Sequence, residues 1–307
     1  MNTQSNAISG TGLRSQELLT DTVPASRRMY WLVRRELFEN RWIYIAPTAV
    51  AVLFLLGFLV SLFGLPGRIR GAAALDAMQR QMMMEQPFTI GAMAIMAAMF
   101  FGSLYYCLEA LHGERRDRSI LFWKSLPVSD LDTVLSKAAI PIVVFPLIAI
   151  VLTFVTHVVM LLMVGAVLLA SGTGPLWRDL PILSMWQALL FHLIFLHGLW
   201  SAPLYAWLML VSAWARRAVL LWAVLPPLAV GVFERVAFGT THFGNWIGYR
   251  FGGPAEFDIM GKGWTIHPMA HIHLGHFLLT PGLWLGLVMA AGLLMAAARV
   301  RRSRGPI

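Results

Sequence analysis

The sequence predicts an all-α integral membrane protein with six transmembrane helices. Of its 307 residues, 58% are hydrophobic and only 13% are charged, and the mean hydropathy is +0.68. An ordinary soluble domain has about 25% charged residues, so a water-soluble fold could not hide this much apolar surface. The polar residues are confined to short stretches between long apolar runs, which leaves no soluble domain of useful size.

Six apolar runs are long enough to form transmembrane helices, since a hydrocarbon core about 30 Å thick takes about 20 helical residues. The fifth run is the least regular, because it is short and contains Pro226 and Pro227. The predicted spans are residues 42–63, 88–107, 140–170, 188–213, 218–233 and 277–297.

The segments before the first span differ in character. Residues 1–26 are polar and lack the apolar core of a signal peptide, so we expect a flexible cytoplasmic leader. Residues 27–41 mix bases with aromatic and apolar residues, which is typical of an amphipathic helix lying in the membrane interface against anionic lipid. The alternative is a cytoplasmic extension of the first span. Residues 42–298 then form the six-helix transmembrane domain.

The basic residues are distributed unevenly between the predicted loops. Seventeen of the 24 Lys and Arg residues fall on one side of the six-span arrangement, including the basic tail, residues 299–307. Because Lys and Arg are retained in the cytoplasm, this predicts a bacterial cytoplasmic (inner) membrane protein with both termini cytoplasmic. The same placement accounts for the net charge of +9 without nucleic acid as a partner. A five-span arrangement would move the basic tail outside.

The inner loop at residues 108–137 carries the most information. A dense cluster of mixed charge is followed by a short apolar helical segment, residues 119–126, which Pro127 ends. Ser129 followed by Asp132 fits a capping box that begins the next helix. Exposed aromatics in this loop need a partner or the membrane surface to cover them. The alternative is a loop that only reverses the chain and fixes topology.

This loop resembles that of a known transporter family. Glu114, Arg115 and Ser119 precede the short helix, and the sequence Leu-Pro-Val-Ser, residues 126–129, and Lys137 follow it. With the interfacial helix, the six spans and a long outer loop at residues 234–276 before the sixth span, the pattern resembles the permease subunits of the type-2 family of ATP-binding-cassette (ABC) exporters.

The resemblance implies a division of labour. The chain has no G-x-x-x-x-G-K-[ST] phosphate loop, so a separate cytoplasmic ABC ATPase subunit would hold ATP and Mg, with no cofactor on this chain. A second permease subunit, in a homodimer, is also expected, alongside membrane lipid. The inner loop would be the coupling helix that contacts the ATPase. The ATPase-coupling residues would be Glu114, Arg115, Arg116, Asp117, Arg118, Phe122, Trp123, Lys124, Leu126 and Pro127.

Aromatic residues of the second and fifth spans are candidates for a substrate pathway. If the family architecture holds, they line a central cavity at the dimer interface that suits a lipophilic or amphipathic substrate. The alternative is ordinary lipid-facing aromatics. The candidates are Phe100, Phe101, Tyr105, Tyr106 and Trp222.

Histidines form two further groups. One group lies on the predicted outer side and is a weak candidate for metal ligands: His267, His271, His273 and His276. The alternative is that these are interfacial histidines in a loop that covers the outer exit. His157, His192 and His197 fall inside spans, where ionisable groups are functional candidates by default, although packing is the simpler interpretation.

The sequence carries no catalytic constellation, and its single Cys107 predicts a small buried side chain. Three functions therefore stand as hypotheses. The first is the permease subunit of an ABC exporter. The second is a membrane assembly or sensor protein that docks another cytoplasmic partner, and the third is a metal-handling ABC permease. Pairing of Arg35 or Glu36 with the charged cluster is a further expectation.

Overall fold

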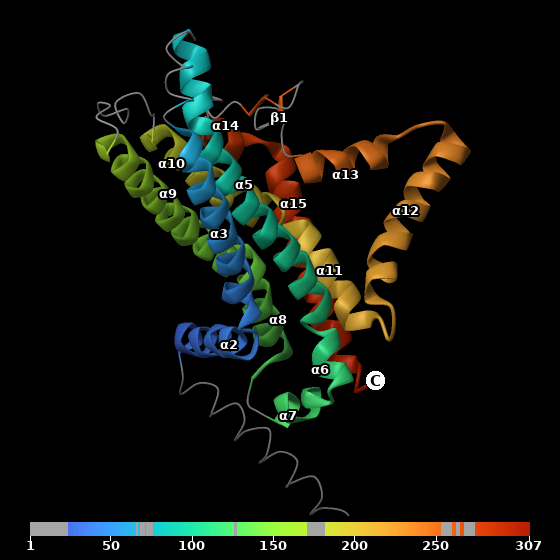
Figure 1. The fold of residues 1–307 in the computed structure, drawn as a ribbon. Coiled ribbons are helices and arrows are strands. Elements are labelled where there is room, and N and C mark those ends of the chain that lie inside the picture. The colour runs from blue at the N-terminus through green and yellow to red at the C-terminus, as the bar shows by residue number, and fades with distance from the viewer. Residues whose placement is uncertain are drawn as a thin grey trace, which may run out of the picture.

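The computed structural model describes residues 24–65, 67, 71, 76–125, 128–170, 182–252, 260–261, 265–266 and 274–307. These residues are helical almost throughout (Figure 1). The described strands are β1 (Met260–Gly261) and β2 (Thr265–Ile266), which pair antiparallel. The predicted all-α class is therefore confirmed for the part of the chain that the structure describes.

Five helical stretches are long and apolar enough to cross a membrane. They contain α3 (Trp42–Ser61), α5 (Ala77–Glu109), the continuous run of α8 (Asp130–Ala139), η2 (Ile140–Val144) and α9 (Phe145–Ala170), then α12 (Val219–Phe238) and α15 (Pro281–Ser303). A sixth crossing follows if the pair Met185–Trp200 and Ala202–Trp214, bent by 43°, is one broken span. That pair comprises α10 (Ile182–Phe191), η4 (His192–Trp200) and α11 (Ala202–Trp214).

Several helices begin at residues other than the first residues of the predicted spans, each for a local reason. α5, which contains the second predicted span, begins at Ala77, before residue 88, because Asp76 caps it by accepting a hydrogen bond from the Gln79 N–H at 2.7 Å. The third continues a helix that begins at Asp130. The sixth begins at Pro281 rather than residue 277, since Pro starts a new helix after α14 (Leu274–Leu279). The fifth remains helical through its two prolines.

The N-terminal helix α2 (Ala25–Glu39) lies across the lower end of α3 (Figure 1). Asn40, with φ −112° and ψ 63°, breaks the helix between the two elements. α2 is therefore a separate helix and does not continue α3, while its predicted place in the membrane interface stays a prediction. A short 3₁₀ turn, η1 (Leu62–Gly64), closes the other end of α3.

The inner loop contains two short helices, α6 (His112–Arg116) and α7 (Ser119–Ser125). The predicted short apolar helix is confirmed as α7, while Leu126 and Pro127 lie outside the described residues. Ser129 accepts a hydrogen bond from the Asp132 N–H at 3.0 Å, so the predicted cap of α8 is confirmed. We call the end of the bundle that carries α2, α6 and α7 the base.

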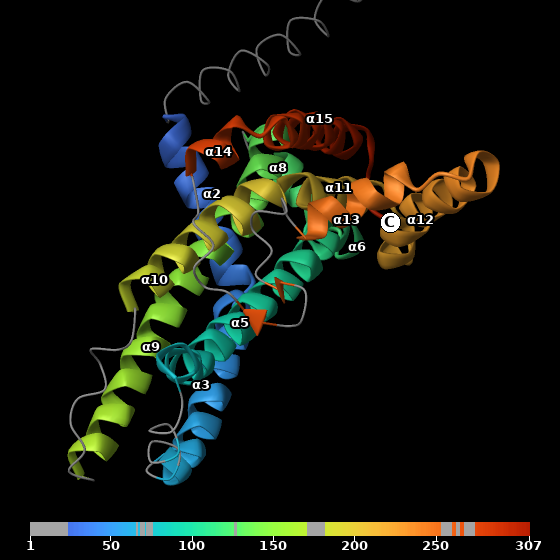
Figure 2. The same cartoon turned by 90° about the horizontal axis from the view of Figure 1, so that it is seen from above.

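The helices form a tilted bundle from which α12 stands apart (Figures 1 and 2). α3, α5 and α9 contact one another, and α11 packs along α15. Only Ala223 of α12 is buried, and its carbonyl accepts a hydrogen bond from Trp207 of α11. At the end opposite the base, α12 leads into α13 (His242–Gly252). α13 and the two strands fall within the predicted long outer loop, and α14 begins at its end and extends past residue 276.

Candidate functional site

Beneath the spans, the base contains a network of buried charges. Its residues come from four elements that are far apart in the sequence: α2, α6, α8 and α15. We call this group the ion-pair network, and its members are Arg35, Glu36, Glu114, Asp130, Lys137 and Arg301.

Glu36 joins α2 to two spanning helices. One carboxylate oxygen lies 2.9 Å from Lys137 Nζ and 2.7 Å from Arg35 Nη2. The other accepts a hydrogen bond from the Tyr106 hydroxyl of α5 at 2.7 Å. Burial alone would raise the pKa of Glu36, but Lys137 and Arg35 outweigh burial and hold that pKa below its ordinary value.

Glu114, like Glu36, is a carboxylate that pairs with more than one cation. Its Oε1 lies 3.2 Å from Lys137 Nζ and 3.6 Å from Arg35 Nη2, as ion pairs without hydrogen-bond geometry. Its Oε2 accepts a hydrogen bond from Arg301 Nη2 at 3.1 Å, and Arg301 also pairs with Asp130. The expected pairing of Arg35 or Glu36 with the charged cluster is thus confirmed for Arg35, which pairs with Glu114, whereas Glu36 pairs with Lys137 outside that cluster.

The network has three cations and three carboxylates, so its formal charge is zero. Neutrality matters because Glu36, Lys137 and Arg301 are each less than 5% exposed, and a buried charge without a partner costs several kcal/mol. Removing any one member leaves an opposite charge unmatched. The network therefore fixes how α2, α6, α8 and α15 sit relative to one another.

Arg115 and Lys124 fasten the inner loop to helix ends. Arg115 Nη1 donates to the carbonyl oxygens of Ala213 and Ala215, at the end of α11, at 2.7 and 3.1 Å. Lys124 Nζ donates to the carbonyls of Arg302 and Arg304, at the end of α15. The last carbonyls of a helix lack internal donors and carry partial negative charge, so cations are favoured there.

Ser212 of α11 joins the loop at a third point. Its Oγ accepts hydrogen bonds from the backbone N–H groups of Leu111 and His112 and donates to the carbonyl of Leu108. These groups lie where α5 gives way to α6, so the hydroxyl replaces the helical bonds lost at the break. The loop is therefore held by side chains on several sides.

α7 has one buried and one exposed face. Ile120 is 1% exposed, and the Trp123 ring lies 3.6 Å from Arg35 Cζ in a cation–π contact. Leu121 and Phe122 point outward and are 59% and 60% exposed. Figure 1 shows α7 at the lowest point of the described chain. The result is a rigidly held helix that presents two large apolar side chains at the base.

Most of the predicted coupling residues fall into a buried and an exposed group, and Trp123 is half-buried against Arg35. Glu114 and Arg115 are 8% and 3% exposed, and their side chains serve contacts inside the chain. The exposed members are Arg116, Asp117, Arg118, Phe122 and Lys124.

Arg118, between α6 and α7, has φ +58°, a left-handed conformation that is uncommon outside glycine. It reverses the chain between the two short helices and so sets the direction of α7.

The predicted pathway aromatics do not gather in one cavity of this chain. Phe101, Tyr105 and Trp222 are exposed on α5 and α12, at 67%, 58% and 46%. Tyr106 instead belongs to the base, bonded to Glu36.

Phe100 contacts rings of two other elements. Its ring centroid lies 5.6 Å from that of His197 in η4 and 6.5 Å from that of Phe251 in α13.

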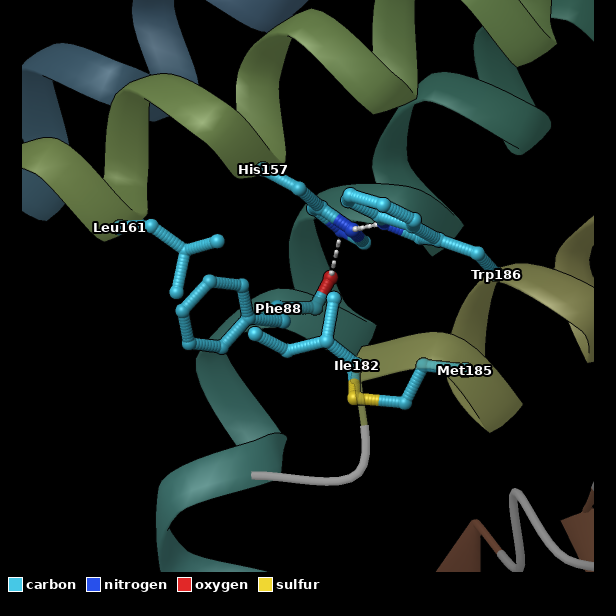
Figure 3. A pocket seen from close by; sticks show the side chains of 6 residues that line it. All are labelled: Phe88, His157, Leu161, Ile182, Met185 and Trp186. Atoms are coloured by element: carbon cyan, nitrogen blue, oxygen red, sulfur yellow. Dashed lines mark hydrogen bonds between the residues drawn. The ribbon is translucent and has the colours of Figure 1, made fainter. Parts of the chain in front are cut away.

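The spanning histidines have different surroundings. His157 lines a small recess with Phe88, Leu161, Ile182, Met185 and Trp186 (Figure 3). Trp186 Nε1 donates to its Nδ1 at 3.2 Å, so Nε2 carries the proton and donates to the Phe88 carbonyl at 3.0 Å. Both ring nitrogens are used, which favours packing over ligand binding.

His197 Nε2 is buried and makes no hydrogen bond within the described part of the chain. His267, His271 and His273 lie outside the described residues, as does the side chain of His276. Among the described residues, no group of three His, Cys, Asp or Glu side chains is arranged to hold a metal ion.

No protein-family model matches the chain, and no curated protein or solved structure matches it. The geometry of the base therefore carries the functional reasoning.

Proposed function

We propose that this chain is the permease subunit of an ATP-driven ABC exporter, working as a dimer in a bacterial inner membrane. A separate ATPase would supply ATP, Mg and hydrolysis from the cytoplasmic side, against the base. The observation that carries the proposal is α7: a short helix whose apolar residues Leu121 and Phe122 are exposed although the helix itself is firmly held.

The attachment of α7 is what a coupling element needs. A helix that transmits force must be rigid toward the membrane domain and apolar toward its partner. α7 is linked to α2 by Trp123 and Arg35, and to α15 by Lys124. A push on Phe122 would therefore move the ends of two helices together rather than bend a loose loop.

The exposed and the buried residues of the inner loop would have different roles in coupling. Phe122 and Leu121, with Arg116 and Asp117 beside them, would form the ATPase contact. Glu114 and Arg115 would transmit the motion through their internal ion pairs and hydrogen bonds. This refines the expectation that all the charged residues of the loop face the ATPase.

Substitution of Phe122 tests the proposal. The full-length chain, purified in mild detergent from its native membranes, should bring with it a nucleotide-binding subunit in a fixed ratio. Phe122→Ala should lower the recovery of that subunit and the ATP hydrolysis of the complex by about tenfold or more, because a buried aromatic anchor contributes about 2 kcal/mol or more to an interface. Quantitative mass spectrometry measures the ratio.

Phe38→Ala is a matched control, since Phe38 of α2 is also 60% exposed. This variant should retain the partner and its activity. Recovery of a partner without nucleotide-binding activity would favour the membrane assembly or sensor protein instead. An intact complex with unchanged hydrolysis after Phe122→Ala would contradict the proposed coupling contact.

A further inference from the structure

Arg250 lies at the end of the bundle opposite the base, where α13 runs beside the start of α15 (Figure 1). Its Cζ is 4.6 Å from the centroid of the Trp200 ring and 5.7 Å from that of Trp246. Its Nη2 donates a hydrogen bond to the carbonyl of Gly282 in the first turn of α15. The guanidinium is thus held in position by three elements.

The backbone of α15 makes room for this side chain. A Cβ atom built on Gly286 would come within 2.5 Å of both Nη1 and Nη2 of Arg250. The guanidinium therefore lies directly against the helix at Gly286. Any larger residue there would push the cation out of its place.

Two N–H donor groups of Arg250 have no hydrogen-bond acceptor among the described residues. Nε and Nη1 of Arg250 are buried without a hydrogen-bond acceptor, and no carboxylate pairs with Arg250 in the described part of the chain. Burial lowers the pKa of the guanidinium. Burying part of a cation whose N–H groups lack acceptors costs free energy, unless an anion accepts hydrogen bonds from those groups.

Within the described residues, the acid closest to Arg250 in sequence is already used. Glu234, at the end of α12, accepts hydrogen bonds from the Thr240 hydroxyl and from the backbone N–H groups of His242 and Phe243. It thereby caps the start of α13 and is not paired with Arg250. The complement to Arg250 must come from outside this part of the chain.

We propose that Arg250 binds the phosphate headgroup of an amphiphile, whose apolar chain lies along the aromatic residues next to it. The guanidinium fork matches a phosphate, and tryptophans favour the depth of lipid headgroups. Phe251 follows Arg250 directly and is 57% exposed, and it contacts Phe100 of α5. Phe101, 67% exposed, continues this apolar surface.

Binding of a defined short-chain lipid tests the site. The full-length chain in neutral detergent is titrated with dihexanoyl phosphatidylglycerol, and binding is followed by intrinsic tryptophan fluorescence and by the melting temperature. Saturable binding is expected, and Arg250→Gln should weaken it about tenfold or more, since a charge-assisted hydrogen bond is lost. Dihexanoylglycerol, which has the same chains and no phosphate, should not compete.

Two further variants separate the site from general effects. Arg235→Gln removes an exposed arginine of α12 and should leave the affinity unchanged. Gly286→Ala keeps every charge but displaces the guanidinium, so it should weaken binding as Arg250→Gln does.

If Arg250→Gln and Gly286→Ala both bind the lipid as tightly as the wild type does, the proposed binding site is wrong. Glycerol 3-phosphate binding as tightly as the lipid would identify a soluble phosphate as the ligand and overturn the amphiphile. The measurement needs no ATPase, so its failure would leave the proposed function untouched.

Discussion

At the scale of single residues, Lys137 and Glu114 make the ion pairs that connect the helices of the base to one another. Lys137 lies between two carboxylates, at 2.9 Å from Glu36 and 3.2 Å from Glu114, and is 4% exposed. Each of these residues touches an element that begins or ends far away in the sequence. Substitutions here should affect stability rather than partner binding alone.

Glu36 should make stability depend on pH. Its pKa is lowered from an ordinary value of 4.5, so the ionised form is favoured in the folded state. That stabilisation is present above about pH 4.5 and is lost as the pH falls through the folded pKa. Glu36→Gln should therefore cost about 3 kcal/mol at pH 7, and the difference from wild type should narrow below pH 4.5. Melting in detergent at several pH values measures this.

Glu39, one turn further along α2, is the control. Burial raises the pKa of Glu39 and outweighs Arg35 at 3.4 Å, so its ionised form is disfavoured on folding. Glu39→Gln should leave the melting temperature at pH 7 unchanged or slightly higher. A loss equal to that of Glu36→Gln would show that general charge, and not the network, sets stability.

The sequence indicated some of these residues and missed others. A pair between Arg35 or Glu36 and the charged cluster was expected, and Arg35 forms it with Glu114, although the sequence alone did not name the partner. Burial of Glu114 and Arg115 was not predictable, since an exposed and a buried cluster look alike in composition. Arg301 was counted only as a basic tail residue, because its partners lie 171 and 187 residues earlier.

At the scale of elements, two π-helical turns meet inside the bundle. η2 in the third span and η4 in the bent pair contact each other, and a Cβ atom on Gly198 would lie only 2.8 Å from the Ile142 carbonyl oxygen. The wider turns and the missing side chain permit this close approach. Such turns leave no mark in hydropathy, so the sequence did not reveal them, whereas α7 and the cap at Ser129 were readable from Pro127 and from spacing.

Gly198→Ala should destabilise the protein by about 1–3 kcal/mol, because the methyl group meets backbone that cannot move alone. Gly57→Ala is the matched variant in α3, where an added Cβ meets nothing within 4 Å. It should be neutral or stabilising by about 0.5–1 kcal/mol through helix propensity. Thermal unfolding of both variants in one detergent decides the comparison, and equal losses would contradict the close contact.

At the scale of the whole molecule, the number of membrane crossings depends on the bent pair. The structure has five apolar stretches and reaches six only if Met185–Trp200 and Ala202–Trp214 form one span. The distribution of bases predicted six, since it keeps the basic tail beside the other basic loops. Hydropathy could locate the long runs but not the 43° bend, which arises from packing.

Cysteine labelling distinguishes five crossings from six. Cys107 is the single cysteine and is buried, so new cysteines report alone. Asp117→Cys and Thr241→Cys sit at exposed turns on either side of the third to fifth spans. With six crossings, a membrane-impermeant maleimide labels them from opposite faces of the membrane. Labelling from the same face would show that the bent pair enters and leaves on one side.

The fastening of the base has a consequence for biosynthesis. Lys124 donates hydrogen bonds to the carbonyl groups of residues that follow it by 178 and 180 positions in the chain. Glu114 accepts a hydrogen bond from Arg301, which follows it by 187 positions. During synthesis, the helices before α15 therefore enter the membrane before these contacts at the base can form, and the contacts form only after α15 has been made. A chain truncated before α15 would leave Lys124 and Glu114 without these partners.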